Sequence, residues 1–359
     1  SATAVSAAAT AATAAADGTV LVAAASSLPR IDVTGLSPSQ VAVSVDFSQP
    51  CILTGVLPSA ACEEWCDSFM DDLGEEEVDF QVRDNRDGLS EVFRSSLTDF
   101  IYGLQDESTH DKSWYLLEEH LLELPQARPQ LGALLATAQE LLGPDEFQLF
   151  PSSVRPQNLC AIVGGVGARS FLHSDPMEWM GWNVLLEGRK LWTFLPPSPE
   201  LDVPLGTYRL APNAFGSHNI SAGWQSNVDL YQRAGEVGVD ARACALWPSE
   251  GGEGGEVMRQ AVSGVQEQGE LVLIPPRCWH QVYHLEPSVA VASQYMDHRV
   301  RHRVFRHILD WCGAAEEARP FPAQLDLLTH ADQIREVLKA ALVARLGPEE
   351  GQRCFDNLD

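Results

Sequence analysis

The sequence predicts a mainly β protein, a sandwich or barrel, with mixed α/β elements before the barrel and helices after it. Between residues 157 and 295, short apolar or alternating runs recur between Gly, Pro and Asn, and no long helical pattern separates them. Such spacing favours packed antiparallel strands over a parallel sheet with crossover helices. Helical spacing of apolar residues occurs before residue 150 and returns after Asp297.

The region before the barrel divides into a tail and a supporting part. Residues 1–27 are mostly Ala, Ser and Thr, and their apolar area is too small to offset the entropy of ordering, so we expect a disordered tail. A transit peptide is the alternative, disfavoured because the first Arg is Arg30. Residues 28–150 should support the barrel, with an extended run at 51–56, solvated loops at 75–77 and 84–87, and helices near 61–73, 95–104 and 128–142.

The barrel is expected over residues 151–298. Its clearest strands are residues 159–163, 183–186, 191–195, 271–274 and 289–292, and a Gly/Glu-rich loop follows Trp247-Pro248 at residues 249–255. Residues 299–359 form a C-terminal helical region, with helices expected at 299–312 and 331–346.

Charge excludes some classes of partner. The chain has 359 residues, with 24 Lys and Arg against 50 Asp and Glu, giving a net charge of −26. Apolar residues make up 45%, enough for a core. The charge would repel phosphate, so nucleic acid and anionic lipid are not expected partners, and basic proteins are favoured. Solubility alone would also explain the acidity.

Cysteine usage and hydropathy indicate a nuclear or cytoplasmic protein. The eight Cys are scattered, and the nearest pair, Cys62 and Cys66, lacks zinc-ribbon spacing, so we expect reduced thiols. The apolar run at residues 20–25 is far shorter than the roughly 20 residues of a membrane span.

The sharpest local feature is His173-x-Asp175. In an extended segment both side chains project to one face, where an imidazole and a carboxylate can hold adjacent positions on an octahedral metal. A second imidazole would complete the facial triad that leaves three positions open on ferrous iron. His280, after an apolar strand and a Pro turn, is the best candidate. His284 would share its face and is the rival, unless it is a hydrogen-bonded core or rim residue.

Lys190 adds a second signal. Its face of the expected strand continues as Trp192 and Phe194, and an ammonium group facing inward among apolar groups is costly unless an anion meets it. A dicarboxylate co-substrate would be such an anion. The alternative is that Lys190 extends to solvent at the start of the strand.

Together these residues resemble the jumonji-C (JmjC) family of Fe(II)- and 2-oxoglutarate-dependent oxygenases over about residues 28–312. The matching positions are His173, Asp175, Pro176, Trp182, Asn183, Gly188, Lys190, Trp192, Pro196, Gly269, Glu270, Ile274, Pro275, Trp279, His280 and Gln294. The spacing from His173 to Lys190 is most similar to a small JmjC group linked to lysyl hydroxylation and, disputedly, to arginine demethylation.

The resemblance implies a double-stranded β-helix, a jelly-roll or cupin-like barrel. It implies that His173, Asp175 and His280 bind iron and that Lys190 binds the distal carboxylate of 2-oxoglutarate. It further implies that Ser170, Tyr115 and Asn183 contact the co-substrate. The chain departs from the group at Ala292, where a hydroxyl residue is usual, and at Gln294, where an Asn is common. Ser293 would point to the other face of a regular strand, so one polar contact near 2-oxoglutarate is lost.

Three functions follow as hypotheses. The first is a dioxygenase that hydroxylates a protein side chain, Lys or Arg in a basic substrate, while 2-oxoglutarate becomes succinate. The second is an N-methyl-lysine or N-methyl-arginine demethylase. The third is a non-catalytic JmjC-like scaffold, which only Ala292 supports.

One basic run stands out in this acidic chain. It comprises His298, Arg299, Arg301, His302, Arg303, Arg306 and His307. Pairing with acidic loops or a subunit contact is favoured over nucleic-acid binding, because the run is short and lies on one expected helix. The resemblance implies that the C-terminal helices could form a homodimer.

Overall fold

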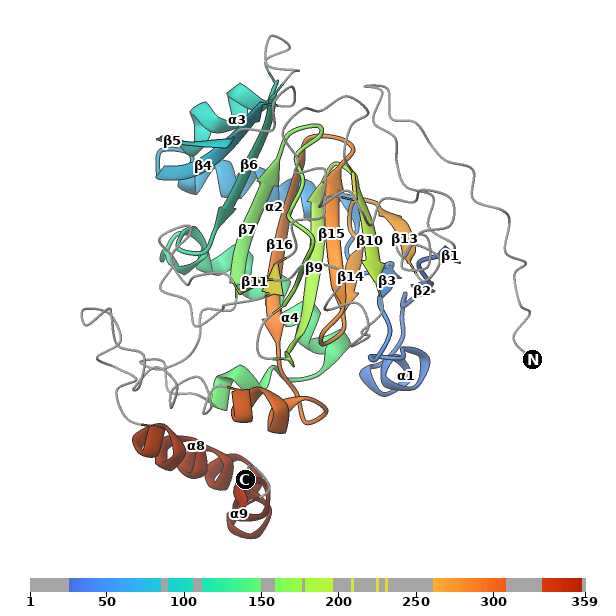
Figure 1. Ribbon diagram of the computed structural model, residues 1–359, viewed down its shortest axis with the longest axis vertical. Coiled ribbons are helices and arrows are strands. Elements are labelled where there is room, and N and C mark those ends of the chain that lie inside the picture. Colours follow the sequence, from blue (N-terminus) through green and yellow to red (C-terminus); the bar gives the residue numbers. More distant parts are fainter. Residues whose placement is uncertain are drawn as a thin grey trace.

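Two β-sheets form the centre of the molecule (Figure 1). The computed structural model describes residues 26–84, 90–105, 112–149, 159–175, 178–195, 208–209, 224–225, 230–231, 261–307 and 331–356. The seven-stranded sheet has the order β1 (Ser26–Ser27), β13 (Val262–Gln266), β10 (Lys190–Leu195), β15 (Trp279–His284), β8 (His173–Ser174), β12 (Trp224–Gln225) and β11 (Tyr208–Arg209). Only its β1–β13 pair is parallel.

The second sheet has nine strands. Their order is β2 (Arg30–Asp32), β3 (Cys51–Thr54), β14 (Leu271–Ile274), β9 (Met180–Glu187), β16 (Ser288–Tyr295), β7 (Leu159–Gly164), β6 (Lys112–Glu118), β4 (Glu77–Asp84) and β5 (Ser90–Ser96). From β7 to β10 and again from β13 to β16, the chain passes between the two sheets: β7, β9, β14 and β16 lie in the larger, β8, β10, β13 and β15 in the smaller. This alternation is a double-stranded β-helix, which confirms the predicted fold class.

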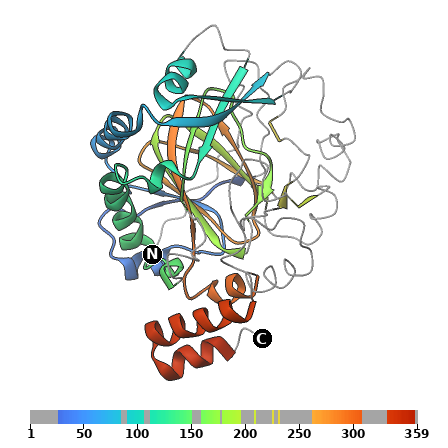
Figure 2. The ribbon, with the colours of Figure 1, turned by 90° about the vertical axis from the view of Figure 1, so that its left-hand side faces the viewer.

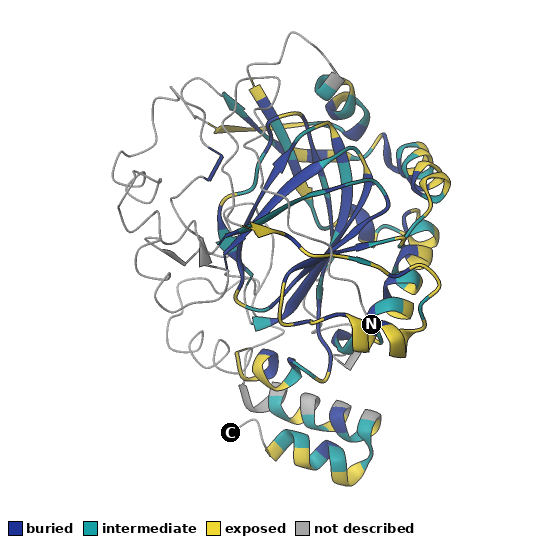
Figure 3. Cartoon of the chain, turned by 90° about the vertical axis from the view of Figure 1, so that its right-hand side faces the viewer, coloured by how far each residue is buried: buried dark blue, intermediate teal, exposed yellow. Residues whose placement is uncertain are grey.

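Apolar side chains fill the barrel and the layer outside it. Between the sheets, Ile52, Trp192, Phe194, Val272 and Ile274 belong to one buried cluster. A larger cluster joins the nine-stranded sheet to the helices. The strands are mostly buried, whereas the helices expose one side (Figure 3). The interior is therefore apolar by default, and polar groups inside it need an explanation.

The helices lie outside the barrel. They are α1 (Pro38–Ser44), α2 (Ser59–Leu73), α3 (Leu97–Gln105), α4 (Arg128–Leu142), α8 (Ala331–Leu346) and α9 (Pro348–Asp356), with 3-10 turns η2 (Leu121–Glu123) and η3 (Glu146–Leu149). Helices α2, α3 and α4 lie on one side of the barrel, and α8 and α9 lie below it (Figure 2). Helix α2 buries Cys62, Trp65, Phe69 and Leu73, whose helical spacing produces one apolar stripe.

Most predicted elements are confirmed. The strands expected at 159–163, 183–186, 191–195, 271–274 and 289–292 are present, as are helices at 61–73, 128–142 and 331–346. Helix α3 begins after Ser96, whose hydroxyl accepts a hydrogen bond from the Asp99 amide at 3.1 Å. Helix α4 ends at Gly143, which has a φ of 94°.

Some expectations need correction. Strand β4 begins at Glu77 and ends at Asp84, which were expected in loops, because Val78, Phe80 and Val82 alternate with polar residues and bury one face against the core. Residues 75 and 76 form the expected turn, and residues 85–87 lie outside the described residues. The sequence also missed β5 and α9. Ser26 and Ser27, assigned to the tail, form β1. The rest of the tail, the loop at 249–255 and the end of the helix expected at 299–312 lie outside the described residues.

No helix among the described residues is both long and apolar enough to span a membrane.

Candidate metal centre

Pairing of β8 with β15 brings the predicted ligands together. His173 and His280 are register partners across the two strands, and their ring centroids lie 4.2 Å apart. Asp175 follows His173 by two residues, with its Oδ1 3.7 Å from His173 Nε2 and 3.9 Å from His280 Nε2. Two atoms bound to one ion at about 2.1 Å each are at most about 4.2 Å apart, so these distances suit one metal ion.

Backbone carbonyls fix how both imidazoles present their nitrogens. His173 Nδ1 lies 2.8 Å from the Phe171 carbonyl, and His280 Nδ1 lies 3.0 Å from the Cys278 carbonyl. In each case Nδ1 donates to a carbonyl two residues earlier, which leaves the Nε2 lone pair directed at the common point. Burial, helped by the charge of His173, lowers the pKa of His280 to about 4, so this ring is neutral near neutral pH.

The three groups differ in exposure. The side chain of His173 is 31% exposed and that of Asp175 is 17%, whereas that of His280 is only 3%. The centre is therefore reachable from the side of His173 and closed behind His280. Two imidazoles and one carboxylate with open positions are the donor set of non-haem ferrous sites, so the residues present fit iron.

Lys190 lies inside the barrel. It is 1% exposed and opens β10, paired in register with Gln266 of β13 and His284 of β15. Among the described residues no carboxylate forms an ion pair with its ammonium group, and burial lowers its pKa to about 7. An enclosed ammonium group without a counter-ion fits a site for an anionic ligand. The alternative of a solvent-directed lysine is wrong.

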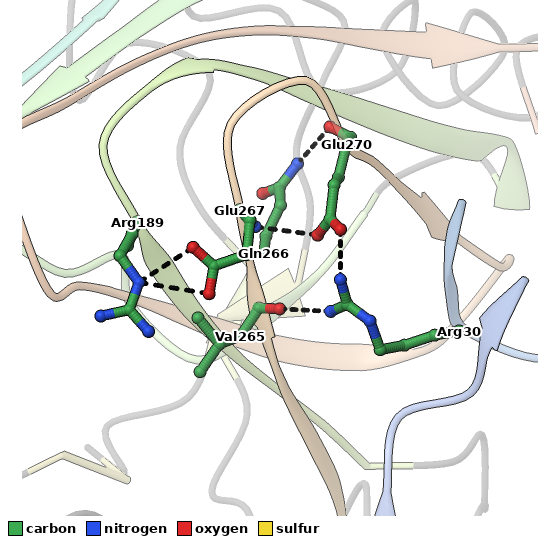
Figure 4. A network of polar contacts seen from close by, with 6 residues as sticks. All are labelled: Arg30, Arg189, Val265, Gln266, Glu267 and Glu270. Atoms are coloured by element: carbon green, nitrogen blue, oxygen red, sulfur yellow. Dashed lines mark hydrogen bonds and ion pairs between the residues drawn. The ribbon is translucent and has the colours of Figure 1, made fainter. Parts of the chain in front are cut away.

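A polar network fixes the start of β10 (Figure 4). Arg189, just before Lys190, donates from Nε to Glu267 at 2.9 Å, and Glu270 forms an ion pair with Arg30. Gln266 Nε2 donates to the carbonyl of Glu270 at 2.9 Å and to that of Asn183 at 2.9 Å. These contacts tie β2, β9, β10 and the β13–β14 turn together, so the Lys190 backbone is held from several sides.

Three neighbouring strands place a row of small or polar groups in the barrel. In register, Ala292 of β16 pairs with Cys160 of β7 on one side and Asn183 of β9 on the other. Register partners present their side chains to one face. Burial raises the pKa of the Cys160 thiol, and the charges of Glu119, Asp175 and Lys190 also act on it. Asn183 is 1% exposed, and its Oδ1 has no hydrogen-bond partner in the described structure.

The comparisons with known proteins agree with this geometry. The model of the cupin-like domain matches residues 40–299. Lysine-specific demethylase JMJ21 of Arabidopsis thaliana is 24% identical over 73% of the chain and 25% of its own length. Arginine-specific demethylase JMJ22 of the same plant is 22% identical over 69% of the chain and 42% of its length.

A third relative is the bifunctional arginine demethylase and lysyl-hydroxylase psr-1 of Caenorhabditis elegans, 26% identical over 42% of the chain and 32% of its length. The chain belongs to the cupin-like JmjC family. It spans less than half the length of these relatives. Their names describe demethylation and lysyl hydroxylation, so this JmjC chain falls in a family of oxygenases and demethylases.

The remaining residues that the resemblance assigned lie around the same JmjC barrel. The Ser170 hydroxyl accepts a hydrogen bond from the Val282 amide at 3.1 Å, which leaves its own proton free to donate. Tyr115 of β6 contacts the His284 ring edge-on, with centroids 5.8 Å apart, and burial raises the pKa of its phenol. Both side chains thus reach the strand that carries His280.

His284 does not join the metal ligands. Its Nδ1 lies 2.6 Å from the Ser288 hydroxyl, and its ring packs so closely on Gly164 that a Cβ there would lie 2.5 Å away. Burial, and then the charge of Lys190, lowers its pKa well below the ordinary value. The structure therefore brings His280, and not its rival, to His173 and Asp175; His284 is a hydrogen-bonded core residue of the JmjC barrel.

Sequence reasoning missed several groups that shape this site. The carbonyls of Phe171 and Cys278 orient the imidazoles, and no side-chain pattern signals a backbone acceptor. Cys160 reaches the space beside Lys190, where burial raises the pKa of its thiol. Its alternation within the run 159–163 could have indicated an inward thiol, but only pairing with β16 shows which side faces the metal ligands.

Proposed function

We propose that the protein is an Fe(II)- and 2-oxoglutarate-dependent dioxygenase that hydroxylates a side chain of a protein substrate. The observation that carries the proposal is the coexistence of two features in one barrel. His173, Asp175 and His280 offer three ligand atoms within 4.8 Å of one another, and Lys190 is an enclosed ammonium group without an acidic partner among the described residues. A protein that only binds a metal ion would need the three ligands but not the enclosed ammonium group.

Each side chain has a defined task. His173, Asp175 and His280 would hold ferrous iron from one side, with both imidazoles oriented by their carbonyl partners. Lys190 would form an ion pair with the distal carboxylate of 2-oxoglutarate. When bound, iron and 2-oxoglutarate would supply oxidation by dioxygen: one oxygen atom would enter a substrate C–H bond, and the other would enter the succinate formed as 2-oxoglutarate loses CO₂.

The neighbours of Lys190 would complete the co-substrate pocket. Asn183 offers a side-chain amide whose Oδ1 has no hydrogen-bond partner in the described structure. Ser170 offers a hydroxyl proton, and Tyr115 offers a phenol. Binding of a dicarboxylate would raise the pKa of Lys190 from about 7, because the ammonium form gains a counter-ion. Ala292 contributes no polar group, so the affinity for 2-oxoglutarate depends more heavily on Lys190.

The substrate is proposed to be a basic protein segment. Net charge of −26 favours encounters with Lys- or Arg-rich partners, and a Lys or Arg side chain is the hydroxylation target in this proposal. Demethylation of an N-methyl-lysine or N-methyl-arginine is the second candidate, favoured by the printed names of the relatives. We also retain homodimerisation through the C-terminal helices and a nuclear or cytoplasmic location as proposals.

Succinate formation tests the proposal. Purified protein with ferrous iron, 2-oxoglutarate and oxygen should release succinate, and His173→Ala should reduce the rate by more than about 100-fold. His120→Ala is the matched control, because His120 is an exposed histidine remote in sequence from the ligands. Mass spectrometry of basic peptides then separates a gain of one oxygen atom from the loss of a methyl group. A wild-type protein that binds iron but forms no succinate would contradict the proposal and favour a non-catalytic scaffold.

A further inference from the structure

The described residues neutralise only part of the basic run after the barrel. Arg299 forms an ion pair with Asp297, and Arg301 lies 3.4 Å from Glu146, as expected for pairing with acidic groups. Four other members of the run line a cavity of about 290 Å³. Its lining residues are Glu178, His302, Arg303, Arg306 and His307.

One carboxylate serves several cations in this cavity. Glu178 lies 3.3 Å from His307 Nε2, and its oxygens are 3.9 Å from both Arg303 and Arg277. A charge-assisted hydrogen bond to carboxylate is about 2.7–2.9 Å long, so Glu178 makes no such bond to either guanidinium. Among these described residues, Arg277, Arg303 and Arg306 carry three positive charges against the one negative charge of Glu178.

The excess positive charge affects the neighbouring imidazole of His302. The pKa of His302 is lowered by burial and then by the charges of Arg303 and Arg306, whereas Glu178 opposes them weakly. The remaining acidic surface does not cancel this local charge, because the Debye length in physiological salt is about 8 Å. A cavity rich in guanidinium donors inside an otherwise acidic protein therefore attracts anions at short range.

The backbone around the cavity is unusual. Glu178 and Arg277 have φ values of 55° and 61°, and they are the two non-glycine residues with positive φ in the described structure. Such strained residues persist where the surroundings hold them, often at ligand-binding sites. Glu178, which lines the cavity, lies three residues after Asp175, and Arg277, 3.9 Å from Glu178, lies three residues before His280. The cavity therefore lies close to the segments that carry two of the candidate metal ligands.

We propose that this cavity binds an anionic oxygen group, a phosphate or a carboxylate, held by Arg303 and Arg306 with Arg277 beside them. The site is separate from the Lys190 pocket and does not depend on the proposed oxidation. The carboxylate of Glu178 competes with the bound anion for these guanidinium groups. Three residues span at most about 11 Å, so the anion would sit near the metal loops. It is either a free ion or an acidic or phosphorylated side chain of a protein partner.

Phosphate binding by the metal-free, full-length protein tests the site. Titration with inorganic phosphate at constant pH and ionic strength, followed by calorimetry, should show saturable binding. We expect Arg303→Gln and Arg306→Gln each to weaken it about 10-fold, since each removes a charged hydrogen-bond donor. Glu178→Gln should instead tighten it several-fold, because the competing charge is gone.

Arg94→Gln is the matched control. It removes one positive charge from Arg94 of β5, which forms an exposed ion pair with Asp79 of β4. It should leave the phosphate affinity unchanged. Two peptides that differ only by serine or phosphoserine then identify the source of the anion. Tighter binding of the phosphopeptide than of inorganic phosphate indicates a side chain of a protein partner. Equal binding of the two indicates a free ion. The proposal is overturned if phosphate does not saturate, if Glu178→Gln weakens binding, or if Arg94→Gln acts like Arg306→Gln.

Discussion

The two ends of strand β15 carry histidines on one face, four residues apart, with opposite surroundings. At one end His280 meets His173 and the carboxylate of Asp175, beside an accessible edge. At the other end His284 meets the ammonium group of Lys190, the Ser288 hydroxyl and the bare backbone of Gly164. Both rings are buried and both have lowered pKa values.

The contrast shows that the neighbours decide the role of a buried histidine. A carboxylate and a second imidazole near Nε2 form a cation site, whereas an ammonium group excludes cations and leaves the imidazole a packing role. One strand thus separates the candidate metal end from the end proposed to bind an anion. Such an arrangement suits a ligand that is bound to the metal at one end and carries negative charge at the other.

The largest expected effect separates the two histidines directly. His280→Ala should weaken ferrous iron binding by more than about 100-fold, since it removes a ligand, while His284→Ala should change it by less than about 10-fold. Anaerobic calorimetric titration with ferrous iron measures both. Equal losses in the two variants would show that the metal centre extends to His284.

The next effect concerns the anion end. Lys190→Met should weaken 2-oxoglutarate binding by about 100-fold or more and should stabilise the ligand-free protein by about 1–4 kcal/mol, because the desolvated ammonium group is replaced by an apolar chain of similar length. Equilibrium urea unfolding and calorimetry measure the two changes.

The pH dependence sharpens this test. The pKa of Lys190 is lowered to about 7 in the folded state, so between about pH 7 and its ordinary pKa of 10.5 the unfolded state binds more protons. The free energy of unfolding should therefore rise with pH across this window in the wild type. In Lys190→Met that rise should be smaller. An unchanged slope would mean that the ammonium group is not desolvated.

The sequence was enough to name His173, Asp175 and His280 as candidate ligands, but strand alternation alone could not exclude His284. His173 and Asp175 share a face by strand alternation alone, and the apolar run before His280 predicts its strand. His284 satisfies the same alternation, so period two cannot reject it. Its fate depends on β10 and β7, which place Lys190 and Gly164 against it. These contacts join segments more than 90 residues apart.

The resemblance supplied what spacing could not, and it had its own limit. It indicated the double-stranded β-helix, which short apolar runs suggest only as a sandwich or barrel. It did not indicate the cavity around Glu178, because that cavity forms where the helical residues 301–307 lie beside the segment that carries Glu178. The β4–β5 pair was missed because its inward Val78, Phe80 and Val82 alternate with charged and polar residues, in a short stretch between two expected loops to which no element was assigned.

A smaller effect probes how tightly the anion end is packed. Gly164→Ala places a Cβ 2.5 Å from the His284 ring, and overpacking should lower the free energy of unfolding by about 1–3 kcal/mol. In a His284→Ala background the same substitution should cost little, because the ring is absent. Gly132→Ala is the control: it has open space on α4 and should stabilise by up to about 1 kcal/mol. Additive losses in the double variant would contradict the contact.

The smallest effect is a change in slope at acidic pH. The folded state keeps His284 neutral well below its ordinary pKa of 6.5, whereas the unfolded chain takes up a proton near 6.5. The unfolded state therefore holds more protons below that pH, and the free energy of unfolding falls as pH decreases, by up to about 1.4 kcal/mol per pH unit from this group. His284→Asn should make the decline shallower by that amount, measured by urea unfolding between about pH 7 and pH 5. His120 is an exposed histidine, so His120→Asn should leave the slope unchanged. A slope for His284→Asn equal to that of the wild type would show that the His284 ring takes up its proton within the folded state.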